Sequence, residues 1–345
     1  MKFYESHYED YIDSIKGNDI HPELNIVYDN MPRTISEFGN MIIYGPTGVG
    51  KYSQALNILR KYSSSNLKYE KKITTQGEKQ DYTFHISDIH YEVDMALLGC
   101  NSKLLWRDVY MQIVDIITMK GDKSGIIVCK NFHMIHAELL EIFYSYMQQH
   151  SANICIRFIL ITEHVSFIPN NIIQSCNIIN VRRPTRKQYS TISNSRFDYD
   201  FANRLPSSDK KNISDNILQK IELNEIMNCK EVKTFAIIKD DKIPKDVFNI
   251  ICDNIIEKMK NHTKLSFVGF RDAIYDMLIY NLDITECIWY ILYHFIQNEK
   301  LRDVDVSDIL DRCYMFLKYY NNNYRPIYHL ESILFYFITK IYNYE

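Results

Sequence analysis

The first 180 residues alternate between short apolar runs and segments in which apolar residues recur every three or four positions. The helical spacing is clear over 103–119 and 139–147 and indicates helices that cover a sheet with one face. Strands separated by helices predict a parallel α/β sheet with flanking helices. The apolar runs typical of strands lie at 41–44, 82–86, 90–94, 126–129, 156–161 and 178–181.

The pattern changes after residue 182. Residues 182–216 are rich in Ser, Asn, Lys, Arg and Asp, which indicates a linker or a reduced small domain, and from about residue 217 only helical spacing remains. Residues 1–38 are polar and mixed in charge and are predicted to be a lead-in rather than part of a core. The domains predicted are therefore a lead-in (1–38), an α/β domain (39–182), a reduced lid or linker (183–235) and a helical domain (236–345). The helices predicted in the last domain cover 247–256, 266–280, 284–298, 305–320 and 327–343.

A glycine-rich motif follows the first apolar run and precedes a helical pattern. Strand, glycine loop and helix form the context in which backbone N–H groups and a helix N-terminus bind phosphate, with a lysine pairing the outer phosphates. The motif predicts a nucleotide-binding loop, and the plainer alternative is a glycine turn packed against a helix. The candidate cofactor-binding residues are Gly45, Pro46, Thr47, Gly48, Val49, Gly50, Lys51, Tyr52 and Ser53.

The residues that would hold magnesium are absent from their usual positions. The hydroxyl residue expected after Lys51 is replaced by Tyr52, and Ser53 comes one position late. The apolar run 126–129 ends in Lys130 and Asn131, where a metal-binding carboxylate is expected. The sequence therefore gives no support for Mg²⁺ at this site, although nucleotide binding by the loop can survive without the groups that accelerate hydrolysis.

Two histidines after this run offer a separate possibility. His133 and His136 form an H-x-x-H pattern that could bind a metal, but two partly exposed histidines that cap a helix start are the preferred interpretation. The predicted set of metal ligands is therefore empty, and so is the set of catalytic residues.

Composition and charge exclude some classes of function but do not select a single one. The net charge is −3, from 40 basic and 43 acidic residues, so the whole chain has no general attraction to nucleic acid or anionic membrane. The eight cysteines form no C-x-x-C pair, which argues against a zinc site and favours a reducing, intracellular location. No signal peptide and no run of about 18 apolar residues is present, so no membrane partner is expected.

With these motifs in place, the chain resembles a small subunit of replication factor C, an AAA+ clamp loader, from about residue 40 onward. It is most similar to the variant subunit whose catalytic motifs are degenerate, in which the hydroxyl residue also comes one position late, as Tyr52-Ser53 does here. The implied fold is an α/β P-loop AAA+ domain, a reduced lid and an all-helical collar domain that forms the oligomer. The segments that carry the resemblance are 43–51, 58–60, 90–94, 101–103, 168–176, 243–246 and 327–331.

The residues that depart from this family's pattern indicate poor or absent hydrolysis, as do the residues that follow the phosphate loop. The family's Ser-Arg-Cys element carries an arginine finger, but here Ser175 is followed directly by Cys176, and the sensor position holds Thr162-Glu163 rather than asparagine. Arg182 and Arg183 lie too far along the chain to replace the finger. The resemblance thus implies a subunit that binds ATP (or ADP) and hydrolyses it poorly or not at all.

The resemblance also implies partners and a location. The partners are other clamp-loader subunits in a hetero-oligomeric ring, a PCNA-type sliding clamp and primer–template DNA. DNA contacts would come from basic side chains such as Lys103, Arg107 and Lys130, each of which could equally be an ordinary surface charge. The implied location is intracellular, in the nucleus or a viral replication compartment. The AT-biased composition and the unrecognisable lead-in would suit a large DNA virus or a parasite genome.

Two other function classes stay open from the sequence. One is a catalytically active AAA+ remodelling ATPase with an unrecognised acid, which would turn over ATP alone. The other is a structural interaction protein whose loop binds no nucleotide.

Overall fold

The computed structural model describes residues 7–17, 19–75, 81–148, 154–194, 226, 247–298, 301–320 and 325–344. The chain forms two compact units, Met1–Lys239 and Asp240–Glu345. Among the described residues, no helix combines the length and the apolar character that a membrane crossing requires.

The first unit is built on a sheet of seven strands in the order β2-β3-β4-β5-β6-β1-β7. The strands are β1 (Asn40–Tyr44), β2 (Lys71–Thr75), β3 (Tyr82–Ile86), β4 (His90–Asp94), β5 (Ser124–Lys130), β6 (Cys155–Thr162) and β7 (Cys176–Asn180). The five strands from β4 to β7 in this order are parallel, as predicted. The sheet is mixed rather than purely parallel, because β2 and β3 at one edge pair antiparallel with their neighbours.

Strand β2 was not predicted because its sequence lacks the apolar run by which a strand is recognised. Its residues, Lys-Lys-Ile-Thr-Thr, lie at the sheet edge, and only Thr75 is buried. Charged side chains are a common way to protect an edge strand, and they remove the apolar run by which a strand is recognised.

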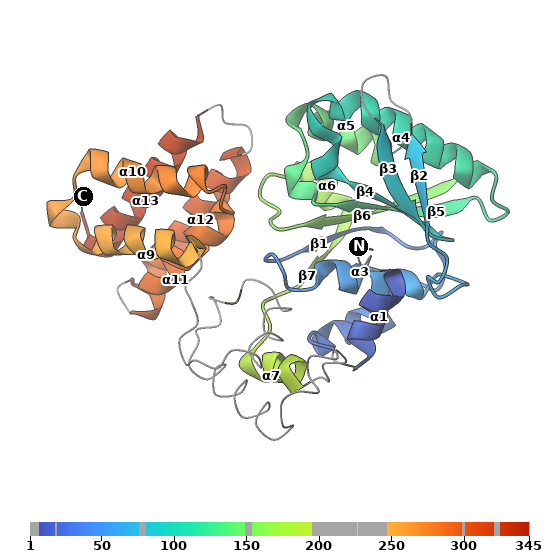
Figure 1. Cartoon of the computed structure of the whole chain (residues 1–345), viewed down its shortest axis with the longest axis horizontal. Helices are drawn as coiled ribbons and strands as arrows, with labels where there is room; N and C mark the ends of the chain where they lie inside the picture. Colours follow the sequence, from blue (N-terminus) through green and yellow to red (C-terminus); the bar gives the residue numbers. More distant parts are fainter. Residues whose placement is uncertain are drawn as a thin grey trace, which may run out of the picture. The chain divides into compact units, whose positions relative to one another are not determined.

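Helices cover both faces of the sheet (Figure 1). Helices α4 (Ser102–Thr118), α5 (Ala137–Met147) and α6 (Asn170–Gln174) lie on one face, and α1 (Tyr8–Gly17) and α3 (Lys51–Arg60) lie on the other. The spacing of Trp106, Val109, Ile113 and Ile117 puts a single buried stripe on α4, against the sheet.

The amino-terminal segment is part of the core, so the prediction of a lead-in without a core role is wrong. Tyr8, Ile12, Leu24 and Phe38 are buried with residues of β1 and α3. These apolar residues are far apart in the sequence and therefore form no visible run. Short helical turns, η1 (Pro22–Leu24) and α2 (Asn25–Asp29), connect α1 to the first strand.

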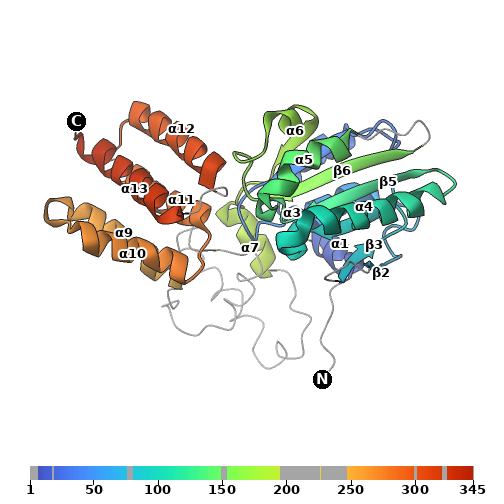
Figure 2. The same cartoon turned by 90° about the horizontal axis from the view of Figure 1, so that it is seen from above.

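The second unit contains only helices among its described residues. They are α9 (Val247–Lys260), η7 (His262–Lys264), α10 (Phe267–Ile279), α11 (Ile284–Gln297), α12 (Asp303–Tyr320) and α13 (Pro326–Tyr342), and Figure 2 shows the long helices side by side. Asp283 begins α11 by accepting hydrogen bonds from the backbone N–H groups of Thr285 and Glu286. All five helices predicted here are confirmed within a few residues.

The predicted fold class, an α/β P-loop domain with flanking helices followed by an all-helical region, is confirmed. The predicted lid at 183–235 lies mostly outside the described residues, which include α7 (Arg186–Asn194) and Ile226. The segment 243–246, which contributes to the clamp-loader resemblance, also lies outside them. The predicted domain boundaries therefore stay predictions.

Candidate nucleotide-binding site

The glycine-rich motif forms the turn between β1 and α3, as the sequence predicted. Residues 45–50 make the turn, and Lys51, Tyr52 and Ser53 are the first three residues of α3. Gly50 has a φ of 93°, in the left-handed region that favours glycine. Gly45 is required for a different reason, because a Cβ atom there would come within 2.0 Å of the Val181 carbonyl oxygen.

Lys51 folds back over this loop. Its Nζ atom donates hydrogen bonds to the carbonyl oxygens of Gly45 (2.7 Å) and Pro46 (2.6 Å). The loop and Lys51 lie at the carboxyl ends of the parallel strands, beside a helix N-terminus, which is where open α/β sheets bind phosphate-bearing ligands. The loop therefore fits the phosphates of a nucleotide.

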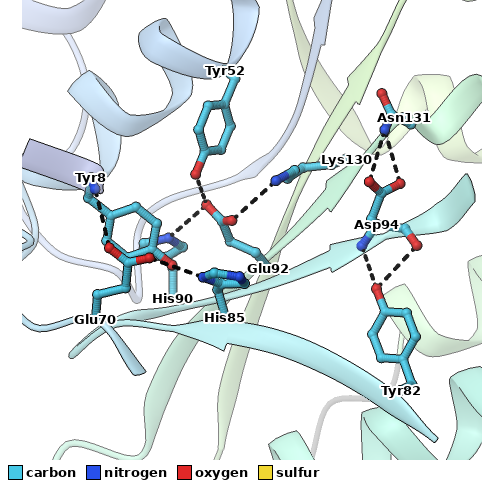
Figure 3. A network of polar contacts seen from close by, with 10 residues as sticks. All are labelled: Tyr8, Tyr52, Glu70, Tyr82, His85, His90, Glu92, Asp94, Lys130 and Asn131. Atoms are coloured by element: carbon cyan, nitrogen blue, oxygen red, sulfur yellow. Dashed lines mark hydrogen bonds and ion pairs between the residues drawn. The ribbon is translucent and has the colours of Figure 1, made fainter. Parts of the chain in front are cut away.

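The Tyr52 side chain points toward Glu92 of strand β4 (Figure 3). Its hydroxyl donates a 2.6 Å hydrogen bond to Oε1 of Glu92, and its ring packs edge-on against Tyr11 of α1. Burial, with the added effect of the Glu92 charge, raises the pKa of the Tyr52 hydroxyl, so it stays protonated and remains a donor. Tyr52 therefore does not replace the serine or threonine that ligates magnesium.

Glu92 is a buried carboxylate, with only 4% of its side chain exposed. Besides Tyr52, it contacts Nε2 of His90 at 3.3 Å and Nζ of Lys130 at 3.5 Å. Burial by itself raises the pKa of this carboxyl, but the His90 hydrogen bond, the positive charges and the Tyr52 hydrogen bond outweigh it and hold the pKa below its ordinary value. Glu92 is thus an anion with its partners already in place.

The hydrogen bonds around Ser87 fix the orientation of His90. The Ser87 hydroxyl oxygen accepts from the backbone N–H groups of Ile89 and His90, so its own proton is directed to Nδ1 of His90. Nε2 then carries a proton and donates it toward Glu92. His90 is therefore oriented as a donor that supports the Glu92 charge.

Lys130 ends β5, as the sequence predicted, and lies in contact with both Glu92 and Tyr52. Its Nζ atom is 4.7 Å from the centroid of the Tyr52 ring, a distance typical of a cation–π contact. The ammonium group suggested for a DNA contact is thus paired with a carboxylate of the same chain. Lys103 and Arg107, the other basic candidates for DNA, are exposed on α4.

Asn131 follows Lys130 and binds a second carboxylate of β4. Its amide nitrogen donates to Oδ1 and Oδ2 of Asp94 at 3.0 and 3.1 Å (Figure 3). Strand β5 ends at Lys130, and Glu92 and Asp94 of the adjacent strand β4 contact Lys130 and Asn131. The sequence signal for Glu92 and Asp94 was the alternation His90-x-Glu92-x-Asp94, which puts three polar side chains on one face of a strand.

His21 supports the phosphate loop and was not predicted. Its ring is 1% exposed, and Nε2 donates a 2.8 Å hydrogen bond to the carbonyl oxygen of Val49 inside the loop. Because a carbonyl oxygen can only accept, Nε2 must carry the proton. No sequence motif marks this contact, which joins residues 28 positions apart.

We expect His21→Ala to lower the free energy of unfolding of the first unit by about 1–3 kcal/mol, because a buried hydrogen bond and packed volume are lost. The midpoint of denaturant-induced unfolding measures this loss. The control is His136→Ala, which alters an exposed ring at the start of α5. Equal midpoints for the two variants would contradict a supporting role for His21.

The structure also places the remaining sequence candidates. Thr162, at the expected sensor position, is fully buried and donates to the carbonyl oxygen of His164. His133 lies 3.6 Å from Glu163, whereas His136 is exposed. The described part of the chain contains no group of three or more His, Cys, Asp or Glu side chains that could hold a metal ion, so the H-x-x-H metal pair gains no support.

Both arginines near the missing finger are bound within the chain. Arg182 pairs with Glu23 at 3.1 Å, and Arg183 donates to the carbonyl oxygen of Ile226 at 2.8 Å. Ser175 is exposed at the end of α6, and Cys176 begins β7. Neither arginine therefore supplies an obvious substitute for the finger.

Comparisons with known proteins give only a distant structural likeness. No protein-family model matches the chain, and no curated protein sequence matches it either. RuvB of Thermotoga maritima, a Holliday junction branch migration motor, aligns with a TM-score of 0.38 and 11% identity over 73% of this chain and 79% of RuvB. A point variant of RuvB aligns with a TM-score of 0.39 and 12% identity over 73% and 78%. We base the fold class on the strand order and the phosphate loop themselves.

Proposed function

We propose that this chain is a subunit of a clamp loader of the replication factor C type, within the AAA+ family. In this proposal it binds ATP (or ADP) at residues 45–53 and hydrolyses it poorly or not at all. Its partners are sister subunits in a hetero-oligomeric ring, a PCNA-type sliding clamp and primer–template DNA, in the nucleus or a viral replication compartment.

One observation carries the nucleotide part of the proposal. The phosphate loop and Lys51 are intact, whereas the positions that would hold magnesium carry Tyr52, bonded to Glu92, and Lys130. Binding needs the loop, but acceleration of hydrolysis needs charges that stabilise the transition state. An intact loop beside altered catalytic positions therefore favours binding without turnover.

The clamp-loader part is supported by the sequence resemblance, together with a P-loop unit followed by a helical unit. Energy for loading would come from ATP hydrolysed at sister subunits. Binding of ATP here would favour the closed ring by stabilising that conformation, a population shift that needs no turnover at this site.

The function is tested by purifying the tagged chain under gentle conditions and identifying its companions by mass spectrometry. We expect other AAA+ subunits with helical collars and a sliding clamp. A chain that is recovered alone, as a monomer, would count strongly against the proposal.

The alternative of an active ATPase has one observation in its favour, the carboxylate of Asp94. Asp94 ends β4 and touches Asn131, so it lies next to the position of the missing acid. We expect the purified chain to release no phosphate from ATP above a protein-free control. Steady release that Asp94→Asn abolishes, while the exposed Asp122→Asn does not, would replace the proposed function by this alternative.

A further inference from the structure

Two positions beside the phosphate loop carry residues that differ from those of a magnesium-binding site. A hydroxyl after the loop lysine and a carboxylate at the end of a nearby parallel strand normally hold a magnesium ion between them. Here they are Tyr52 and Lys130, and these two side chains touch, with Nζ 4.7 Å from the ring centroid. A cationic side chain therefore lies where oxygen ligands for a cation are expected.

The residues present do not fit magnesium. Mg²⁺ requires an octahedral set of oxygen ligands at short distances. The Tyr52 hydroxyl already donates to Glu92, and Glu92 is neutralised by Lys130 and bonded to His90. A divalent cation in contact with this cluster would also be repelled by the Lys130 ammonium.

Lys130 is placed to act on a ligand of the loop. Its side chain is 33% exposed, whereas that of its partner Glu92 is 4% exposed, so the ammonium end of the cluster is the open one. β5 and β1 are both parallel to β6, so their carboxyl ends meet at one edge of the sheet, with the phosphate loop. A flexible lysine at that edge can approach phosphate oxygens without breaking the Tyr52–Glu92 hydrogen bond.

We propose that the ammonium group of Lys130 takes the place of magnesium, so that this chain binds the metal-free triphosphate anion. Lys51, Lys130 and the N-terminus of α3 together supply the positive charge that the phosphates require. Glu92 and Tyr52 hold Lys130 at the strand end, and His90 holds Glu92. This inference rests on the proposed nucleotide binding and specifies its ionic form.

The test is calorimetry of ATP binding to the full chain, with excess magnesium and with excess EDTA. We expect the two dissociation constants to agree within about threefold, or ATP to bind more tightly in EDTA. A loss of about tenfold or more in EDTA would overturn the inference and leave the proposed nucleotide binding intact. If ATP fails to bind under either condition, the proposed function fails as well.

A variant then assigns the effect to Lys130. Lys130→Gln is expected to weaken ATP binding in EDTA by about tenfold or more, because one of the two lysine charges is lost. The matched control is Lys120→Gln: Lys120 also lies over a tyrosine ring, at 5.0 Å from the Tyr91 centroid, but before β5 rather than at its end. Unchanged binding by Lys130→Gln, with a melting temperature that shows a folded protein, would overturn the assignment.

Discussion

Lys51→Ala should weaken ATP binding by about 30- to 150-fold, because a charged hydrogen-bond donor to the phosphates is worth roughly 2–3 kcal/mol. The fold should survive, since these two hydrogen bonds of Lys51 go to backbone carbonyl oxygens of its own loop rather than to another part of the core. Calorimetry with ATP measures the loss of affinity, and circular dichroism checks the fold.

The chain offers a matched control for this variant at the other end of the same helix. Lys61, just after α3, also donates to two carbonyl oxygens, those of Tyr28 at 3.0 Å and Met31 at 3.1 Å. Lys61→Ala should therefore bind ATP like the unaltered chain. If Lys51→Ala retained full affinity for ATP, the result would favour the hypothesis of a structural interaction protein whose loop binds no nucleotide.

Glu92→Gln should lower the free energy of unfolding of the first unit by about 1.5–3 kcal/mol near neutral pH, because hydrogen bonds to a buried charged group are lost. The substitution removes the carboxylate that Lys130, His90 and Tyr52 share, and it leaves the lysine charge without its partner. Hydrogen exchange of the β4 and β5 amides measures the opening of this unit.

The effect of Glu92→Gln should depend on pH in a defined direction. Because the pKa of Glu92 is lowered in the folded chain, its contribution to stability is complete above the ordinary glutamate value of 4.5. It is lost as the pH falls through the lower, folded value, so the difference between the two proteins should shrink below about pH 4.5. A difference that stayed constant in acid would show that the Glu92 charge is not its source.

Glu70→Gln is the control for this experiment. Glu70 also contacts a histidine, His85 at 3.1 Å, but it is more exposed, at 17%. Glu70→Gln should lower the free energy of unfolding by less than Glu92→Gln does, because ion pairs nearer the surface contribute less to stability.

Local chemistry was enough to predict the phosphate loop. The fold places residues 45–50 between β1 and α3, because the glycines and the flanking apolar spacing act within a few positions of one another. The helices of the second unit were predicted for the same reason, since their buried faces repeat every three or four residues. The nucleotide itself stays a prediction until binding is measured.

Local sequence patterns did not predict the contacts between segments that lie far apart along the chain. His21 reaches Val49 across 28 positions, and the amino-terminal residues Tyr8 and Ile12 join the core without forming an apolar run. The edge strand β2 is polar because one side of it has no neighbouring strand, so its sequence resembles a loop.

The sequence by itself determined that Lys51 is present and that no acid ends β5. Only the tertiary structure decided what surrounds Lys130 and Asn131, because β4 and β5 are neighbours in the sheet but are separated by α4 along the chain. Strand pairing aligns Asp94 with Lys130 and brings Glu92 within reach of Lys130 and Tyr52. The sequence gives the identity of each residue, whereas the pairing of strands determines which charged groups lie next to it.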